Sequence, residues 1–281
     1  MCALQLKGMD NNTKRILFVN SEIYPYVPET EISRIGRYLP QGIQERKKEI
    51  RSFMPRYGCI NESKNQLHEV IRLSGMNIII SDLDRPLVIK VASIPVARMQ
   101  VYFIDNEDYF KRKQMFRDEG GSFFEDNDER AVFFAKGILE TVKKLRWAPD
   151  IIHCQGWISH LLPVYLKKIY KDDPIFTSSK IVLSLYNDIA PAEHFSSDFQ
   201  SKVAMGAIRP EDVPLLADCD GINLAKTAIQ YADAVIAGSA DTDASLLEWS
   251  KSKGLPVLPY NPSAMDDGSY IDEYNAFYDS L

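Results

Sequence analysis

The sequence predicts an α/β fold with a doubly wound parallel sheet and helices on both faces. Short apolar strands alternate repeatedly with helices of about 10–18 residues, which is the pattern of a parallel sheet built from strand–helix–strand units. One stretch, about residues 66–104, breaks this alternation with several short strands and indicates a small antiparallel hairpin insertion. The chain has 281 residues, of which 45% are hydrophobic and 26% charged, so it can bury the core of such a Rossmann-like domain.

The first predicted unit is a strand, a turn and a helix near the N-terminus. Arg15–Asn20 is a continuous apolar and β-branched run, typical of a buried parallel strand. Residues 31–48 then carry apolar side chains on one helical face, at Ile32, Ile35, Leu39 and Ile43. Pro40 lies within this helix and is expected to kink or break it. Glu49–Pro55 is the second predicted strand.

The middle of the chain changes character. Residues 68–73, 76–80, 87–92 and 98–104 are short predicted strands, divided by Gly75, the 82–86 turn and Pro95. Residues 105–127 are polar and aromatic without a clear period, so we expect a surface excursion.

The alternation resumes with a helix over 128–147, which has acidic residues in its first turn and basic residues in its last. The elements predicted after it are strand 150–154, helix 156–170, strand 180–186, irregular 188–219, helix 221–231, strand 232–239 and helix 241–253. We therefore divide the chain into a flexible N-terminus (1–14), one Rossmann-type domain (15–254) and a C-terminal tail (255–281). The acidic, aromatic end of that tail, residues 266–281, is either disordered or covers the face left bare by a missing second domain.

Composition excludes several classes of function. The net charge of −6 leaves no basic stripe to neutralise phosphates, so no nucleic-acid partner is expected. The four cysteines are far apart in sequence and predict neither a metal site nor a disulfide framework. No apolar run approaches the ~20 residues of a membrane helix, and residues 1–14 are too polar for a cleavable signal. These features predict a cytoplasmic protein without a membrane partner.

Functional groups of a doubly wound sheet lie at the carboxyl ends of its strands. His153 ends one predicted strand and is either a general base or a histidine held by hydrogen bonds. Trp157 follows it and either stacks on a sugar ring or packs between helix and sheet. Tyr186, Asn187 and Asp188 follow the next strand and suit a polar ligand such as a carbohydrate, but also an ordinary loop.

The turn after the first strand is acidic where nucleotide-binding folds place a glycine-rich phosphate loop. Glu29 and Glu31 are candidates for an acid–base pair, or they simply favour the start of the helix that Thr30 would cap. The chain contains no Walker A loop, GxGxxG, GxSxG, HExxH or DxDxDG motif, so these nucleotide, hydrolase and metal sites are unsupported.

An ordered set of segments resembles the starch/glycogen synthases of glycosyltransferase family 5. Residues 15–25 resemble the family's opening ILFVxSExxP, and 53–58 resemble VMPRYG. Residues 101–110 are similar to VYFIDNPEYF, 126–130 to DNAERF, and 149–157 to PDIIHCHDW. Residues 37–44 resemble ALPxAL, and 231–237 resemble YADxVxTVS. The likeness runs from about Arg15 to Trp249 and is strongest to the short, single-domain members found in some bacteria.

The resemblance implies one half of a GT-B glycosyltransferase, the N-terminal catalytic domain. It implies glucosyl transfer from ADP-glucose to an α-1,4-glucan such as glycogen or a maltooligosaccharide, without a metal or other cofactor. On the matching segments, Gln155 joins His153, Glu29 and Glu31 as a catalytic candidate. The substrate-binding candidates are Glu22, Thr30, Asn127, Arg130, Trp157, Tyr186, Asn187 and Asp188.

The chain departs from the family pattern at the donor site. The family's Lys-Thr-Gly-Gly-Leu-Gly-Asp is replaced by residues 28–34, PETEISR, which lack the lysine and the glycines. The family's HxHDW reads HCQGW at 153–157, and only Asn187 remains from the core of HNLAYQG. The second domain of the family, which holds most of the donor, has no counterpart in this sequence.

Three hypotheses remain open from the sequence. The first is a glucosyltransferase that is weakly active or works with a partner subunit or as a homo-oligomer. The second, which these departures favour, is a non-catalytic glucan-binding or regulatory module. The third is a glycosyltransferase-like fold that binds an unrelated polar ligand. The sequence leaves open whether ADP-glucose binds at all.

Overall fold

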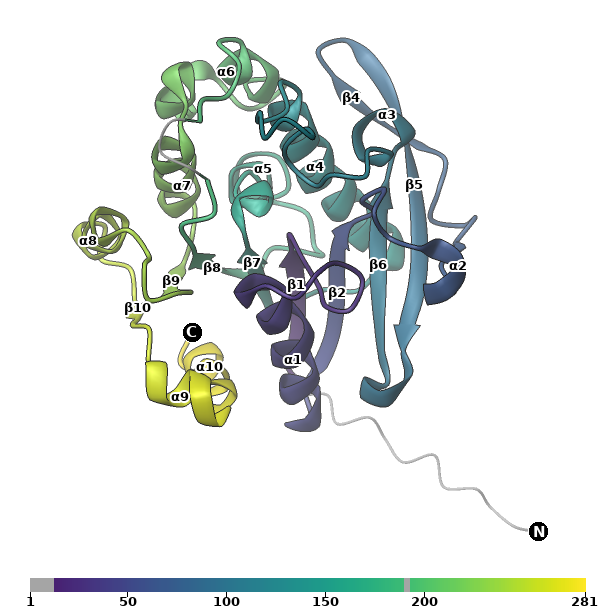
Figure 1. The fold of residues 1–281 in the computed structure, drawn as a ribbon. Coiled ribbons are helices and arrows are strands. Elements are labelled where there is room, and N and C mark those ends of the chain that lie inside the picture. The colour runs from purple at the N-terminus through teal and green to yellow at the C-terminus, as the bar shows by residue number, and fades with distance from the viewer. Residues whose placement is uncertain (1–12, 190–192) are drawn as a thin grey trace.

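The computed structural model describes residues 13–189 and 193–281. Most of the predicted flexible N-terminus therefore lies outside the described residues. Within them, the strands form one ten-stranded sheet in the order β10-β9-β8-β7-β1-β2-β6-β5-β3, with β4 paired to β5 (Figure 1). The strands are β1 (Arg15–Asn20), β2 (Glu49–Pro55), β3 (His68–Glu69), β4 (Met76–Ile80), β5 (Leu83–Ile94), β6 (Met99–Asp105), β7 (Ile151–Gln155), β8 (Lys180–Leu185), β9 (Ala234–Ala237) and β10 (Val257–Leu258).

The sheet is mostly parallel, which confirms the predicted fold class. Every neighbouring pair from β10 across to β6 is parallel. β5 runs antiparallel to β6, β4 and β3, as expected for inserted hairpins. β6 pairs with both β2 and β5, so the hairpin region shares its last strand with the parallel sheet.

Helices cover both faces of the parallel strands. They are α1 (Glu31–Glu45), α2 (Glu62–Asn65), α3 (Glu107–Phe110), α4 (Asn127–Leu145), α5 (Leu162–Lys168), α6 (Phe199–Val203), α7 (Gly221–Gln230), α8 (Ala244–Ser252), α9 (Pro262–Asp267) and α10 (Tyr270–Asp279). Short 3₁₀ turns are η1 (Pro95–Ala97), η2 (Trp157–Ser159), η3 (Pro210–Asp212) and η4 (Pro214–Asp218).

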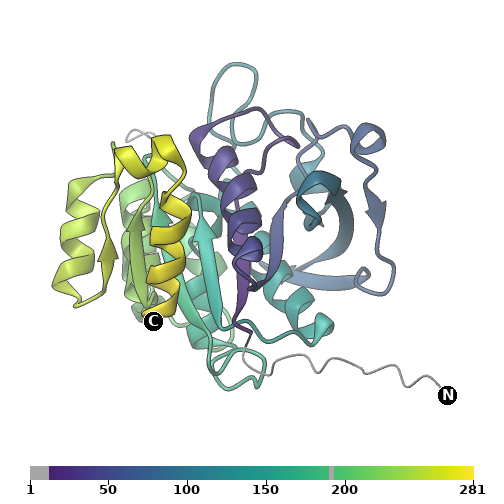
Figure 2. The same ribbon diagram turned by 90° about the horizontal axis from the view of Figure 1, so that it is seen from below.

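Alternate residues of each strand point to opposite faces and divide the core in two. Leu17 and Val19 of β1 face the larger cluster, which includes side chains of α4, α5 and α7. Ile16 and Phe18 face the smaller cluster, which is completed by α1, α9 and α10. α1 and α10 lie side by side on that face (Figures 1 and 2).

Several local predictions differ from the structure. The predicted strand 68–73 shortens to β3, and the predicted turn 82–86 lies almost wholly within β5. α1 continues through Pro40 to Glu45, because its buried stripe of Ile35, Leu39 and Ile43 against the sheet outweighs the local cost of a proline, about 3 kcal/mol. The predicted helix 156–170 is divided into η2 and α5. α5 begins at Leu162 with Pro163 in its first turn, where the missing N–H costs no helical hydrogen bond.

The segment 105–127 is more than a surface excursion. Its aromatic residues Tyr109 and Phe110 are buried, and Phe116 and Phe123 pack against the larger core cluster. Their spacing has no helical or strand period because most of this segment is an irregular loop that covers the core.

The tail from residue 255 is ordered. β10 pairs with β9, and α9 and α10 follow it. Tyr270, Tyr274 and Tyr278 of α10 are buried against the sheet and α1. The tail therefore packs on the sheet face that also carries α1.

Candidate functional site at the carboxyl edge of the sheet

The topological switch point of the sheet lies between β1 and β7. The chain leaves β1 toward β2 and leaves β7 toward β8, and ligand crevices of open α/β sheets form outside such strand ends. The segments that follow β1 and β7 lie close together at this point, because Ser21 N–H donates to Gln155 O at 2.9 Å. Gly156 has φ +82° and ψ 152°, and a Cβ there would lie 2.1 Å from Ser21 Oγ. This backbone conformation is nearly restricted to glycine.

His153 lies inside the sheet and has no exposed surface. Its Nε2 is 2.7 Å from Ser184 Oγ, and its Nδ1 is 2.7 Å from the hydroxyl of Tyr278 in α10. Burial lowers its pKa to about 3, so the ring is neutral near pH 7. The structure therefore gives each ring nitrogen of His153 a hydrogen-bond partner inside the protein.

Gln155, the last residue of β7, and Tyr186, the residue after β8, are neighbours. Both are buried, and the Tyr186 hydroxyl is 3.5 Å from Gln155 Oε1, at the limit of a hydrogen bond. Gln155 Nε2 has no hydrogen-bond partner among the described residues. Burial holds the pKa of Tyr186 well above its usual value, so its hydroxyl stays protonated.

Asp188 is the most unusual carboxyl group at this edge. Its Oδ2 accepts a hydrogen bond from Trp157 N at 2.7 Å. Burial raises its pKa to about 7; that hydrogen bond opposes the rise and the nearby Glu22 carboxylate adds to it. Asp188 therefore titrates near neutral pH, where it can donate or accept a proton.

The start of α1 is closed by the chain's own side chains. Thr30 Oγ1 accepts from Ser33 N–H at 3.0 Å, and Ser33 Oγ accepts from Thr30 N–H at 2.7 Å, which is a complete capping box. Thr30 also donates to Glu22 Oε2 at 2.6 Å. Burial raises the pKa of Glu22. The N–H groups of Thr30 and Ser33 are thus taken by side chains and are not available to a phosphate.

Glu29 and Glu31 lie at the outer side of the same turn. Glu29 pairs with Arg34 at 3.5 Å, and both side chains are exposed. Glu31 Oε1 accepts from the hydroxyl of Tyr260, which comes from the tail, at 3.2 Å. Partial burial raises the pKa of Glu31. The two carboxylates have separate partners rather than facing one another as a pair.

A cavity of about 180 Å³ opens beside Asp188, between the end of β8 and the starts of α7 and α8. Its apolar walls come from Trp157, Ile189, Ile222, Ala225 and Leu246, and its polar groups from His160, Tyr186, Asn187, Asp188, Asp220 and Asp243. Three carboxylates among so few residues favour a ligand that donates hydrogen bonds, such as the hydroxyls of a sugar.

His160 lines this cavity and is only 3% exposed. Neither ring nitrogen has a partner in the described part of the chain. Burial lowers its pKa to about 4, so the neutral ring presents one donor and one acceptor. A buried polar group without a partner is costly and indicates a place for a ligand or water.

Trp157 belongs to the core rather than to the cavity's open side. It is 1% exposed and packs against Phe116, Phe123 and Phe195 with ring centroids 4.9–5.6 Å apart. This geometry matches the packing interpretation of Trp157, not the stacking one.

Asn127 and Arg130 are fully buried and lie in α4, apart from the cavity. Arg130 donates to Asn127 Oδ1 at 2.6 Å and lies over Phe110, Phe116 and Phe124. Burial lowers its pKa to about 10. The structure therefore brings Glu22, Thr30, Gln155, Tyr186, Asn187 and Asp188 to one edge of the sheet, whereas His153, Asn127 and Arg130 are inside the protein.

Sequence reasoning did not identify His160, Asp220 or Asp243. Asp220 and Asp243 accept hydrogen bonds from the first-turn N–H groups of α7 and α8. Asp220 directly precedes the predicted helix 221–231 and was a usable signal, whereas Asp243 lay within the predicted helix 241–253. No sequence signal pointed to His160, because its position depends on how the predicted helix 156–170 divides.

In the described residues, no three histidine, cysteine, aspartate or glutamate side chains are grouped to hold a metal ion. None of the helices in that part of the chain is long and apolar enough to cross a bilayer.

Comparison with known proteins gives consistent results. The starch synthase catalytic domain model matches residues 15–256. A glycogen synthase of Chlorobium limicola is 34% identical over 265 residues, covering 89% of this chain and 54% of that protein. A glycogen synthase of Chlorobaculum tepidum is 35% identical over 224 residues, covering 79% of this chain and 45% of that protein.

The fold has a solved counterpart in the catalytic domain of starch synthase IV from Arabidopsis thaliana, a structure bound to ADP and acarbose. The TM-score is 0.70 at 15% identity, over 90% of this chain and 52% of that one. The chain spans about half the length of the curated relatives it matches. With a family model over most of its length and relatives above 30% identity, the chain belongs to the starch synthase catalytic domain family, glycosyltransferase family 5.

Proposed function

We propose that this chain binds α-1,4-glucan through the cavity at the carboxyl edge and does not itself transfer glucose from ADP-glucose. The observation that carries the proposal is the capped, acidic start of α1. Thr30 and Ser33 occupy each other's N–H groups, and Glu22, Glu29 and Glu31 surround the turn. A diphosphate placed there would meet these carboxylates, and the N–H groups of Thr30 and Ser33 would not be available to it.

The cavity supports the binding half of the proposal. Its carboxylates accept hydrogen bonds from sugar hydroxyls, its apolar wall suits the C–H face of a sugar, and His160 offers a buried donor and acceptor without a partner in the described residues. On the family relationship, we expect the bound glucan to be glycogen or a maltooligosaccharide. We place this activity in the cytoplasm.

A second candidate is glucosyl transfer that depends on a partner subunit or a second copy of the chain to supply the other wall of the cleft. The pKa of Asp188, raised to about 7, favours this candidate because it provides an acid–base group beside the cavity.

Affinity electrophoresis in glycogen-containing gels tests the binding function. We expect retardation relative to a control protein of similar charge, and a shift at least five times smaller for Asn187→Ala, because Asn187 lies exposed at the cavity. Asn77→Ala, at an exposed position of β4, is the matched control and should migrate like the unmodified protein. Equal migration with and without glycogen would contradict glucan binding.

ADP release in the presence of ADP-glucose and glycogen tests the absence of transfer. We expect no release above a blank. Steady release by the purified chain, abolished by Asp188→Asn, would overturn the proposal. Release only after a second protein is added would support the partner-dependent candidate instead.

A further inference from the structure

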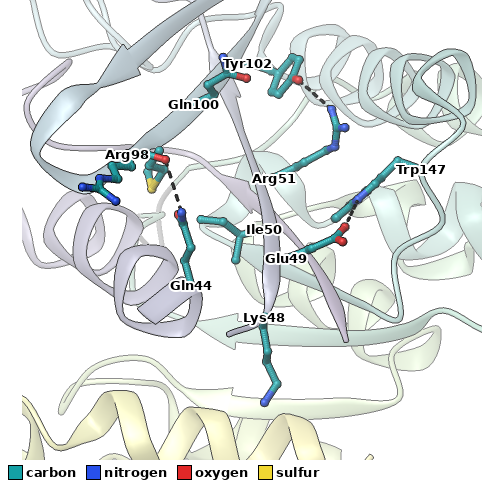
Figure 3. A pocket seen from close by; sticks show the side chains of 10 residues that line it. Gln44, Lys48, Glu49, Ile50, Arg51, Arg98, Gln100, Tyr102 and Trp147 are labelled. Atoms are coloured by element: carbon teal, nitrogen blue, oxygen red, sulfur yellow. Dashed lines mark hydrogen bonds between the residues drawn. The ribbon is translucent and has the colours of Figure 1, made fainter. Parts of the chain in front are cut away.

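A second cavity, of about 390 Å³, lies at the amino edge of the sheet, away from the site described above. It opens where β2 and β6 begin, beside the last turn of α1 and the segment that follows α4. Its lining residues are Gln44, Lys48, Glu49, Ile50, Arg51, Arg98, Met99, Gln100, Tyr102 and Trp147 (Figure 3).

The charges of this cavity leave two guanidinium groups unneutralised. Glu49 is paired with Arg15 at 3.2 Å, and Lys48 with Asp279 at 3.0 Å. Arg51 and Arg98 have no carboxylate within 4 Å in the described residues. In a chain of net charge −6, a concave surface with two unpaired arginines favours an anionic ligand.

Arg51 is held in place before any ligand arrives. It donates to the hydroxyl of Tyr102 at 2.7 Å, and its guanidinium lies over the rings of Tyr102 and Trp147 at 5.6 and 5.1 Å. Trp147 is itself fixed by a hydrogen bond to Glu49 at 3.1 Å. A fixed guanidinium loses less conformational entropy when it binds an anion.

Figure 3 shows Arg98 on the opposite side of the cavity from Arg51, and Lys48 directed away toward α10. Arg98 is exposed, and its side chain has no hydrogen bond or ion pair in the described residues. Its backbone carbonyl accepts a long hydrogen bond, 3.4 Å, from Gln44 Nε2. Arg98 is therefore free to turn toward a bound anion.

Gln44 adds a feature that a bare anion would not use. Its Oε1 is buried and has no hydrogen-bond partner within the described part of the chain. An unsatisfied buried acceptor requires a donor such as a hydroxyl group. The amide of Gln100 lies exposed at the same cavity.

We propose that this cavity binds the monophosphate ester of a small hydroxylated molecule, with a hexose phosphate as the matching size and chemistry. A phosphate monoester carries a charge of about −1.5 to −2 near pH 7. Two guanidinium groups balance that charge better than they balance the single charge of a carboxylate. The sugar hydroxyls would donate to Gln44 Oε1. This site is separate from the proposed glucan site, since no residue lines both cavities.

Isothermal titration calorimetry with glucose 6-phosphate, glucose, gluconate and inorganic phosphate tests the proposal on the intact chain. We expect glucose 6-phosphate to bind at least ten times more tightly than each of the other three. Arg98→Gln and Arg51→Gln should each weaken the binding of glucose 6-phosphate at least ten-fold. Gln44→Leu should reduce the difference in affinity between glucose 6-phosphate and inorganic phosphate. Arg72→Gln removes an exposed arginine outside the cavity and should leave binding unchanged.

Arg98→Gln is the decisive variant, because this exposed side chain supports no packing and the variant keeps its fold, which circular dichroism verifies. Unchanged affinity in Arg98→Gln would overturn the assignment. Equal affinity for glucose and glucose 6-phosphate would overturn the requirement for an anion, and equal affinity for gluconate would overturn the choice of phosphate. These results do not depend on glycogen binding, so failure here is distinguishable from failure of the proposed function.

Discussion

His153 illustrates at the residue scale how one position in a strand allows two interpretations. It follows two apolar residues in a predicted strand, where a histidine can reach a crevice or point into a core. The side chains of β7 alternate between faces, and His153 lies on the face that α10 covers. Tyr278 of α10 and Ser184 of the neighbouring strand β8 occupy its two ring nitrogens. The structure favours the hydrogen-bonded interpretation that the sequence had left open.

The low pKa of His153 predicts a specific pH dependence of stability. The folded ring has a pKa of about 3 and the unfolded ring about 6.5, so only the unfolded chain binds the proton as pH falls below 6.5. The contribution of the buried neutral ring to the free energy of unfolding is fully present above pH 6.5 and is lost on acidification. This loss is about 2 kcal/mol between pH 7 and 5. His153→Gln should remove that part of the loss.

Urea unfolding at pH 7 and pH 5 measures this difference. Groups such as Asp188, whose raised pKa acts in the opposite direction, are present in both proteins and cancel. The exposed His68, replaced by glutamine, provides the control and should retain the pH dependence of the unmodified chain. If His153→Gln loses as much free energy of unfolding between pH 7 and pH 5 as the unmodified chain, His153 is accessible to protons in the folded state.

At the element scale, α10 is a structural part of the domain. Its tyrosines complete the smaller core cluster against α1 and the sheet, and Lys48 and Arg46 make ion pairs with its Asp279 and Asp272. Its composition, acidic and aromatic, resembles that of a surface tail, but the aromatic residues at positions 270, 274 and 278 repeat every four residues and form one helical stripe.

Tyr278→Phe tests how α10 is docked. The ring stays buried, but His153 Nδ1 loses its partner inside the core, so we expect the free energy of unfolding to fall by about 1–3 kcal/mol. Tyr38→Phe is the control, since Tyr38 is 44% exposed, and it should change stability by less than about 0.5 kcal/mol. Chemical denaturation monitored by circular dichroism provides both values; equal stability of the Tyr278→Phe variant and the parent protein would mean that α10 is not anchored through this bond.

At the scale of the whole molecule, one sheet joins all parts of the described chain. The hairpin strands β3, β4 and β5 connect to the parallel strands through β6, and the tail joins through β10. The larger core cluster includes residues of the hairpins, of α4 and of α7. Neither the hairpin region nor the tail has a core of its own.

This continuity predicts a single cooperative unfolding transition. Calorimetry should give one peak, and far-ultraviolet and near-ultraviolet circular dichroism should lose their signals at the same temperature. Tryptophan fluorescence reports on Trp147, Trp157 and Trp249 in different regions and should follow the same curve. Two separated transitions would show that the hairpins or the tail unfold independently.

Much of the fold followed from local patterns. The bounds of β1 and β2 were predicted to the residue, because a run of buried strand residues between polar turns is visible in sequence. The split of helix 156–170 and the burial of Tyr109 and Phe110 were not predicted, since both depend on what packs against them. The carboxyl edge was predicted as the location of the site, but His160 and the amino-edge cavity were not.

The sequence by itself determined the fold class and the family, because periodicity and ordered motifs are properties of the chain alone. It also determined that the turn before α1 is acidic and lacks close-approach glycines. Only the tertiary structure decided that this turn is closed by Thr30 and Ser33, that His153 meets Tyr278 across 125 residues of chain, and that Arg51 and Arg98 line one cavity. The reason is that burial and hydrogen bonding between distant segments set the protonation state of each side chain and its access to a ligand. These contacts leave no local pattern in the sequence.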